Sequence, residues 1–256
     1  MDFFYILAGA TVGFIIGLTG VGGGSLMTPL LVLGFNIQPT IAVGTDLLYA
    51  AITKASGVWS HQKLKNIDWS ITKNLMLGSI PGSIACIAVI QYLRVPEEII
   101  EHLISLTLGV MLILTAIVIL FKDKIAHKYK RKISSRPKRF IIISLGAVLG
   151  ILVTISSVGA GAIGSAMLLL LYPSLATRTI VGTDIAHAVP LTAIAGLGHL
   201  NLGHVDFSLL FSLIAGSIPA IYVGSIIGER LPDKALKYIL ASILLAIGIK
   251  FSISIV

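Results

Sequence analysis

Two glycine-rich stretches lie inside long apolar segments of the sequence, where glycine is unfavourable. They comprise Gly20, Gly22, Gly23, Gly24 and Ser25 in the first stretch, and Ser156, Ser157, Gly159 and Gly161 in the second. A glycine in a helix interior costs about 1 kcal/mol relative to alanine, so these clusters predict two broken helices. The freed amides and the helix N-terminus after each break would bind an anion. Close packing of two membrane helices through small residues is the alternative interpretation.

Two aspartates follow the glycine stretches, each in the sequence Val-Gly-Thr-Asp. They are Asp46 beside Thr45, and Asp184 beside Thr183. A carboxylate deep in a membrane span is expensive and should face the protein interior or a water-filled cavity. Each aspartate is therefore either a protonatable coupling site or a buried group that bonds to backbone at the broken helix. We assign the two threonines to the same coupling or gating region.

Two further ionisable residues lie near these aspartates. Lys54 is eight residues beyond Asp46, too far along one helix for an ion pair with it. Lys54 can pair across the chain with Asp184, hold a substrate anion, or extend towards the membrane surface. His187 lies one helical turn beyond Asp184, where it can serve either a proton relay or a satisfied core pair.

The composition is that of a polytopic helical membrane protein. Of 256 residues, 56% are apolar and only 12% are charged, against about 25% charged residues in soluble domains. The net charge is +8, and nine of the nineteen Lys and Arg residues fall between Lys122 and Arg139. This concentration indicates membrane topology and contact with anionic lipid, and not a nucleic-acid surface.

The apolar segments predict a broken first helix followed by three spans. Residues 3–34 as one helix would be about 48 Å long, well beyond the roughly 30 Å hydrocarbon core. We therefore expect this segment to break at Gly20–Gly24 and three spans to follow at about 40–60, 70–93 and 98–121. Residues 122–139 would form a basic linker, which the positive-inside rule places in the cytoplasm.

The same pattern returns after the linker, at an offset of 138 residues through the middle of each half. Val-Gly-Thr-Asp at 43–46 returns at 181–184, and Gly-Ser-Ile-Pro at 78–81 returns at 216–219. The sequence thus predicts two homologous repeats, 1–121 and 140–256. Lys63 and Lys65 have no basic counterparts in the second half, and opposite charge bias at equivalent loops favours inverted repeats. Inversion requires the broken first segment to enter and leave on one side, whereas parallel repeats follow if that segment crosses fully.

The paired glycine stretches, the paired Val-Gly-Thr-Asp and the repeated His…Asp loops at 61–68 and 199–206 together resemble the TauE/SafE sulfite exporter family, also called the toluene-sulfonate uptake permease (TSUP) family. The resemblance covers about 3–121 and 140–254. It implies a carrier of small sulfur-containing anions in the inner membrane, with the two glycine-rich segments meeting at the substrate site. The second stretch has Ala160 where the first has Gly23, so the two halves of that site differ.

We therefore expect an all-helical secondary transporter with a central anion site, alternating access and no cofactor or metal. Coupling to protons through Asp46 or Asp184 is a further expectation. The sequence carries no catalytic motif of a hydrolase, nucleotide enzyme or metalloprotease, so we expect no enzyme. An anion channel and a non-transporting membrane subunit or enzyme remain the alternatives. The identity of the anion, the direction of transport and the oligomeric state are left open.

Overall fold

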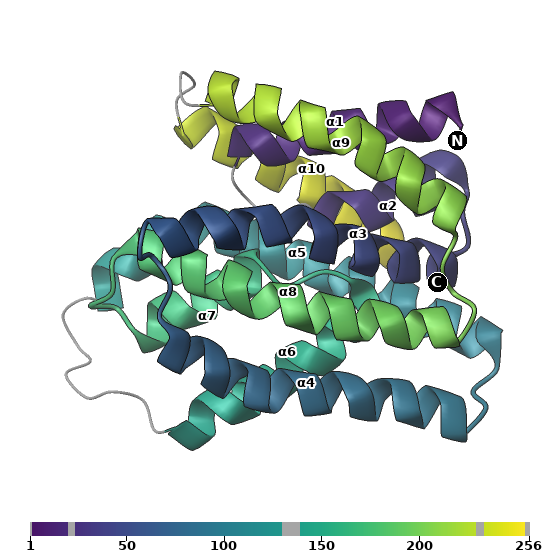
Figure 1. The fold of residues 1–256 in the computed structure, drawn as a ribbon, viewed down its shortest axis with the longest axis horizontal. Helices are drawn as coiled ribbons and strands as arrows, with labels where there is room; N and C mark the ends of the chain where they lie inside the picture. The colour runs from purple at the N-terminus through teal and green to yellow at the C-terminus, as the bar shows by residue number, and fades with distance from the viewer. Residues whose placement is uncertain (1, 20–23, 130–138, 229–232, 254–256) are drawn as a thin grey trace.

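The protein is entirely helical in the residues that its computed structural model describes, which are 2–19, 24–129, 139–228 and 233–253. The first half contains α1 (Phe3–Thr19), α2 (Gly24–Phe35), α3 (Pro39–Lys63), α4 (Trp69–Tyr92) and α5 (Glu97–Tyr129). The second half contains α6 (Arg139–Ser156), α7 (Ala162–Leu171), α8 (Thr177–Asn201), α9 (Phe207–Gly228) and α10 (Asp233–Ile253). Figure 1 shows these helices stacked in one bundle. The predicted all-α fold is confirmed.

The outer surface of the bundle suits a bilayer. Five helices are long and apolar enough to cross a membrane, namely α4, residues 97–121 of α5, α6, α8 and α9. Large apolar side chains on the outer face of α4 are exposed, including Leu77, Ile84 and Val89. Contiguous exposed apolar surface of this kind marks contact with lipid or with another protein. Because these helices are long enough to cross a bilayer, lipid is the partner that we infer for this surface.

Each half opens with a helical hairpin. The rings of Tyr5 in α1 and Phe35 in α2 lie 5.4 Å apart, so the hairpin begins and ends at one end of the bundle. In the second half, Ile142 near the start of α6 shares a buried cluster with Leu168 and Leu169 near the end of α7. Three longer helices follow each hairpin.

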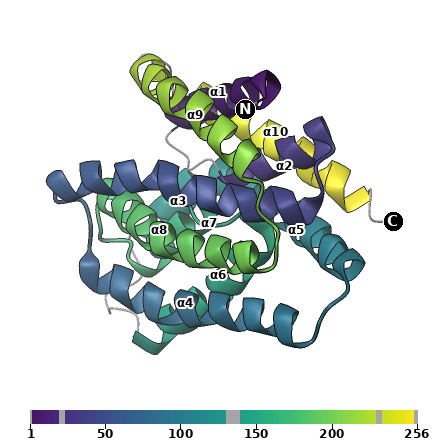
Figure 2. The ribbon, with the colours of Figure 1, turned by 45° about the vertical axis from the view of Figure 1, so that its right-hand side comes forward.

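The two halves exchange their first helices. α1 packs along α9, and its sequence equivalent α6 packs along α4 (Figure 2). Glycines allow these close contacts, since a Cβ built on Gly78 of α4 would lie 1.9 Å from the Ile143 carbonyl oxygen, and one on Gly216 of α9 would lie 1.9 Å from that of Ile6. The first helix of each half therefore packs against a helix of the other half.

α3 and α8, which are equivalent in the sequence repeat, lie side by side and run in opposite directions. Gly44 near the start of α3 lies against His199 near the end of α8, whereas Gly57 near the end of α3 lies against Ile185 near the start of α8. Figure 1 shows the same opposition. An inverted repeat requires this arrangement, although the orientation of each half across a bilayer stays a prediction.

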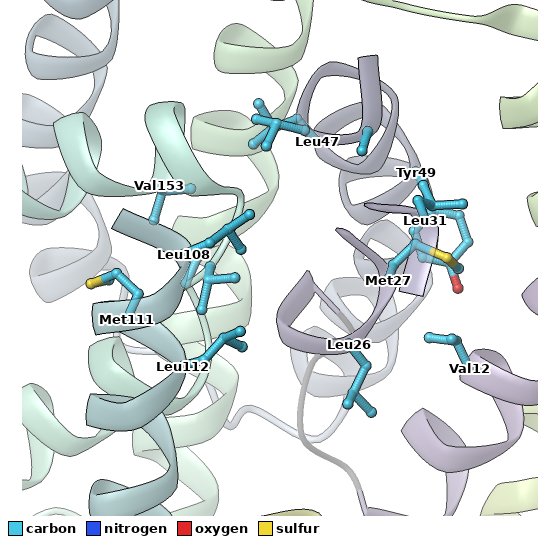
Figure 3. Close-up of a cluster of buried hydrophobic side chains, with 14 of the residues drawn as sticks. Val12, Leu26, Met27, Leu31, Leu47, Tyr49, Leu108, Met111, Leu112 and Val153 are labelled. Atoms are coloured by element: carbon cyan, nitrogen blue, oxygen red, sulfur yellow. The ribbon is translucent and has the colours of Figure 1, made fainter. Parts of the chain in front are cut away.

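One buried apolar cluster joins the two halves. It brings together the short helix α2, the middle of α3, the inner face of α5 and the end of α6. Figure 3 shows its members Leu26, Met27, Leu31, Leu47, Leu108, Met111, Leu112 and Val153. Because these side chains are almost fully buried, the cluster fixes the position of α2 against α3.

The first part of the predicted basic linker is helical. α5 continues past residue 121 and remains helical through Tyr129. Residues 122–129 contain neither glycine nor proline, so nothing local ends the helix when the apolar span ends. Residues 130–138 lie outside the described part of the chain.

Candidate functional site

The second glycine-rich stretch is a complete break between two helices. α6 ends at Ser156 and α7 begins at Ala162. Three residues in the break have positive φ, namely Ser157 at 57°, Gly159 at 118° and Gly161 at 141°. Glycine adopts this region at little cost, which explains the two glycines here. The first break, with Gly20, Gly22 and Gly23, lies outside the described residues, and α2 begins at Gly24.

Lys54 reaches from α3 of the first half into this break of the second half. Its Nζ donates a hydrogen bond to the Ala160 carbonyl oxygen at 2.9 Å. It also interacts electrostatically with Asp184 and Asp46. The side chain is 8% exposed and is the only buried Lys or Arg in the described part of the chain. Of the three alternatives for Lys54, extension towards the membrane surface does not occur.

Asp46 faces the first turns of the short helix α2. Thr28 Oγ1 donates a hydrogen bond to Asp46 Oδ2 at 2.5 Å. Asp46 Oδ1 and the Ser157 hydroxyl are also buried, and neither has a hydrogen-bond partner among the described residues. Ser157 is nevertheless a neighbour of Asp46, so this carboxylate lies between α2 and the second break.

Asp184 holds the equivalent position beside α7. A Cβ built on Gly164, in the first turn of α7, would lie 2.1 Å from Asp184 Oδ1. Glycine is therefore required there for the carboxylate to approach the helix. A negative charge near a helix N-terminus is stabilised by the helix dipole. Asp46 and Asp184 thus lie beside the first turns of α2 and α7, where a substrate anion was expected to bind.

The serines of the predicted site have different surroundings. Ser156 Oγ is engaged locally, since it donates to the Leu152 carbonyl at 2.8 Å and accepts from the Val158 amide at 3.2 Å. Ser25 is buried in the first turn of α2. Of these serines, Ser157 is the one that neighbours Asp46.

Thr45 and Thr183 link the two halves. Thr45 Oγ1 accepts a hydrogen bond from the Asp206 amide at 3.1 Å, and Thr183 Oγ1 accepts one from the Asp68 amide at 2.9 Å. Asp68 in turn caps α4 by accepting from the Ser70 amide. Both threonines therefore position loops, and these loops lie at opposite ends of the bundle.

We expect Thr45→Val to destabilise the protein by about 1–3 kcal/mol, because it leaves the Asp206 amide without its acceptor. Thermal unfolding of the purified protein in detergent measures the effect. Thr53→Val on the same helix is the matched control, since Thr53 bonds only to carbonyls of its own helix. Equal melting temperatures for the two variants would contradict this role for Thr45.

His187 points to α4 and not along α8 to Asp184. Its Nε2 lies 2.8 Å from the Ser79 hydroxyl, and its Nδ1 is buried with no partner among the described residues. The equivalent pair in the other half is Tyr49 and Ser217, which are also neighbours. His187 therefore pairs with Ser79 and not with Asp184, the neighbour expected from the sequence, and the proton relay stays a prediction.

A pair of histidines lies at the end of the bundle opposite the linker. His199 Nδ1 and His204 Nδ1 are 3.2 Å apart, and His199 Nε2 lies 2.9 Å from the Thr154 carbonyl oxygen. Burial lowers the pKa of His204, which lies in the loop after α8, and the nearby Glu97 opposes part of that shift. This pair connects the loop to the end of α6.

Three neighbours of the ionisable residues were not predicted from the sequence. They are Thr28 beside Asp46, Gly164 beside Asp184 and Ser79 beside His187. A signal for Ser79 was present, because Gly-Ser-Ile-Pro occurs at 78–81 and again at 216–219. In the structure the serines of both copies are fully buried, and they neighbour His187 and Tyr49. Thr28 and Gly164 carry no such repeated signal.

The comparisons with known proteins agree with this architecture. The family described as "Sulfite exporter TauE/SafE" matches residues 5–251. The chain is 39% identical over 249 residues to the probable membrane transporter protein YjnA of Bacillus subtilis, covering 96% of this chain and 97% of the relative. It is 31% identical to the probable membrane transporter protein YdhB of the same organism, covering 91% of this chain and 92% of the relative.

A more distant relative has similar coverage. The probable membrane transporter protein MJ0441 of Methanocaldococcus jannaschii is 28% identical over 265 residues, which cover 95% of this chain and 92% of the relative. No solved structure is significantly similar to this chain. The match extends over both repeats, the central aspartates and the second break, and so this chain belongs to the TauE/SafE family of membrane transporters.

Proposed function

We propose that the protein is a secondary transporter that exports a small sulfur-containing oxyanion, sulfite or an organosulfonate, across the inner membrane. The family description names a sulfite exporter. The observation that carries the proposal is the buried Lys54, whose ammonium group bonds into the break of the other repeat. Cationic residues inside a membrane mark ion and substrate pathways.

The position of Lys54 and of the short helices near the middle of the bundle supports alternating access. α2 has 12 residues and α7 has 10, so they are about 18 Å and 15 Å long. Neither crosses a hydrocarbon core of about 30 Å, so α2 and α7 would each begin near mid-depth. Broken helices at the interface of two repeats are the usual substrate site of secondary transporters.

The direction of the repeats supports an inverted topology with the 122–139 linker in the cytoplasm. The linker end of the bundle carries Lys63, Lys65 and Lys73, whereas Glu97 and Glu98 begin α5 at the other end. Lys and Arg are concentrated in cytoplasmic loops. The hairpin that opens each half would return to the side where it begins, and the three helices that follow it then give the odd number of crossings that inversion requires.

Asp46 and Asp184 compete with the substrate for the same groups in this proposal. An ionised carboxylate beside α2 or α7 stabilises Lys54 and occupies the positive end of the short helix. Protonation removes that negative charge and frees Lys54 and the helix ends for the anion. Anion and proton movement are then coupled, with no cofactor.

We expect Asp46→Asn to retain sulfite flux but to lose its dependence on a pH gradient, because the amide can still accept from Thr28 and cannot ionise. Flux into proteoliposomes is measured with and without the gradient, and Asp184→Asn is tested in parallel. Asp206→Asn, at a helix cap near the bundle end, is the control and should keep the coupling of the unmodified protein. Unchanged coupling in both Asp46→Asn and Asp184→Asn would remove these carboxylates from the mechanism.

The transporter itself is tested by sulfite flux and by thermal shift. Flux through the unmodified protein should saturate with sulfite concentration and show counterflow. Ohmic single-channel current would instead establish an anion channel, and neither flux nor current would favour a non-transporting subunit. A screen of sulfite, sulfate, thiosulfate and short sulfonates should identify the ligand, because a ligand of the folded state raises its melting temperature.

A further inference from the structure

A groove of about 730 Å³ lies outside the central site, on the face of α4 beside the start of α6. Its volume is in the range of pockets that hold drug-sized ligands. At one end it is lined by Lys73 and Arg139, together with Ser70 and Asn74. At the other end it is lined by apolar residues, among them Leu77 and Ile80.

The polar and apolar ends follow one face of α4. The lining residues 70, 73, 74, 77, 80 and 81 recur every three or four positions, so they form a single stripe along the helix. From 70 to 81 the helix rises about 16 Å. The groove is thus polar for its first turn and apolar for the next two, and Lys73 and Leu77 are exposed.

The polar end lies at the membrane surface. Trp59 and Trp69 are the only tryptophans of the sequence, and both are exposed near this end of the bundle. Tryptophan is enriched where a protein passes from hydrocarbon to headgroups. Trp69 begins α4, one residue before Ser70, so Lys73 and Arg139 are placed at headgroup level and the apolar stripe is placed among acyl chains.

We propose that this groove binds one anionic phospholipid of the leaflet at the linker end. Lys73 and Arg139 contact its phosphate, Ser70 and Asn74 offer hydrogen bonds to the headgroup, and an acyl chain follows Met76, Leu77 and Ile80. Asp68 is the nearest carboxylate along α4, and its charge is engaged in capping Ser70 and Ile71. The two cations therefore dominate the polar end, and the charge selects an anionic headgroup over a zwitterionic one.

The test is native mass spectrometry of the full-length protein, with phosphatidylglycerol or phosphatidylcholine of the same acyl chains added. The unmodified protein should retain one phosphatidylglycerol in preference to phosphatidylcholine. Lys73→Gln and Arg139→Gln should each weaken phosphatidylglycerol binding about fivefold, the effect expected for one cation at an anionic surface. Leu77→Trp should weaken the binding of both lipids by filling the apolar end.

Arg178→Gln is the matched control, because Arg178 is exposed at the same end of the bundle and does not line the groove. Its phosphatidylglycerol affinity should equal that of the unmodified protein. An equal loss in Arg178→Gln and Lys73→Gln would show general surface attraction and overturn the site, as would equal retention of the two lipids by the unmodified protein. Because Lys73, Arg139 and Arg178 are all exposed, the three glutamine variants should fold and give unchanged size-exclusion profiles. A changed profile for Lys73→Gln and Arg139→Gln alone would contradict the assignment, because the two side chains would then be needed for folding.

Discussion

Replacing Lys54 with glutamine should reduce sulfite affinity about 10- to 100-fold, because a hydrogen bond to a charged group is worth about 1.5–3 kcal/mol. Lys54 is the one buried cation in the described part of the chain, and it bonds to the Ala160 carbonyl in the second break. Glutamine can still donate to that carbonyl, so the break keeps a partner while the charge is lost. The measurement is the concentration dependence of the thermal shift by sulfite, together with flux in proteoliposomes.

Thr192→Val is the matched control for Lys54→Gln. Thr192 occupies the equivalent position in the second repeat, and its hydroxyl bonds to the Ala188 carbonyl of its own helix at 2.9 Å. This variant should bind sulfite as the unmodified protein does. Lys54→Arg should recover part of the affinity, because it restores the charge with a different shape. Full sulfite affinity in a folded Lys54→Gln protein would show that the anion binds elsewhere.

Gly44→Ala should lower the free energy of unfolding by at least about 1–3 kcal/mol, the usual cost of overpacking a core. A Cβ at residue 44 would lie 2.0 Å from the His204 carbonyl oxygen. That oxygen belongs to the loop before α9, whose Asp206 amide bonds to the neighbouring Thr45. The substitution must therefore move α3 away from this loop, and thermal unfolding should show a clear drop in melting temperature.

Gly57→Ala on the same helix separates packing from helix propensity. A Cβ at residue 57 would meet only Ile185 Cγ2, at an ordinary contact distance of 3.5 Å. This variant should be neutral or more stable, since alanine is favoured over glycine by about 1 kcal/mol in a helix. If the two variants lost stability equally, the close contact at Gly44 would not be the cause.

Local signals explain why most of the helices could be predicted from sequence. Pro39 lies at the first position of α3, and Asp68 caps α4 through its side chain, so both boundaries carry recognisable residue types. α5 continues beyond its predicted span at 98–121, because the change from apolar to basic residues marks the membrane surface and not the end of a helix. The break at 157–161 was predictable because its glycines are needed for positive φ.

The central contacts could be predicted only in part. Asp46, Asp184 and Lys54 were identifiable because ionisable groups are costly in a membrane. Their partners were not, because the Lys54–Ala160 hydrogen bond joins residues that are 106 positions apart, and the Thr45–Asp206 bond joins residues that are 161 apart. Such pairs depend on how the two repeats pack against each other, and this packing leaves no local pattern in the sequence. Gly164 is a further example, since its need for glycine arises only from the approach of Asp184.

The exchange of first helices between the halves has a consequence for biosynthesis. α1 ends at Thr19, but its packing partner α9 begins at Phe207. At roughly 5–20 residues per second, α1 leaves the ribosome on the order of 10 to 40 seconds before that partner exists. During this interval its glycine-lined face is open to lipid and to quality-control proteases. We therefore expect a nascent chain halted after α8 to be degraded, and we expect two separately translated halves to need each other in the bilayer before either completes its fold.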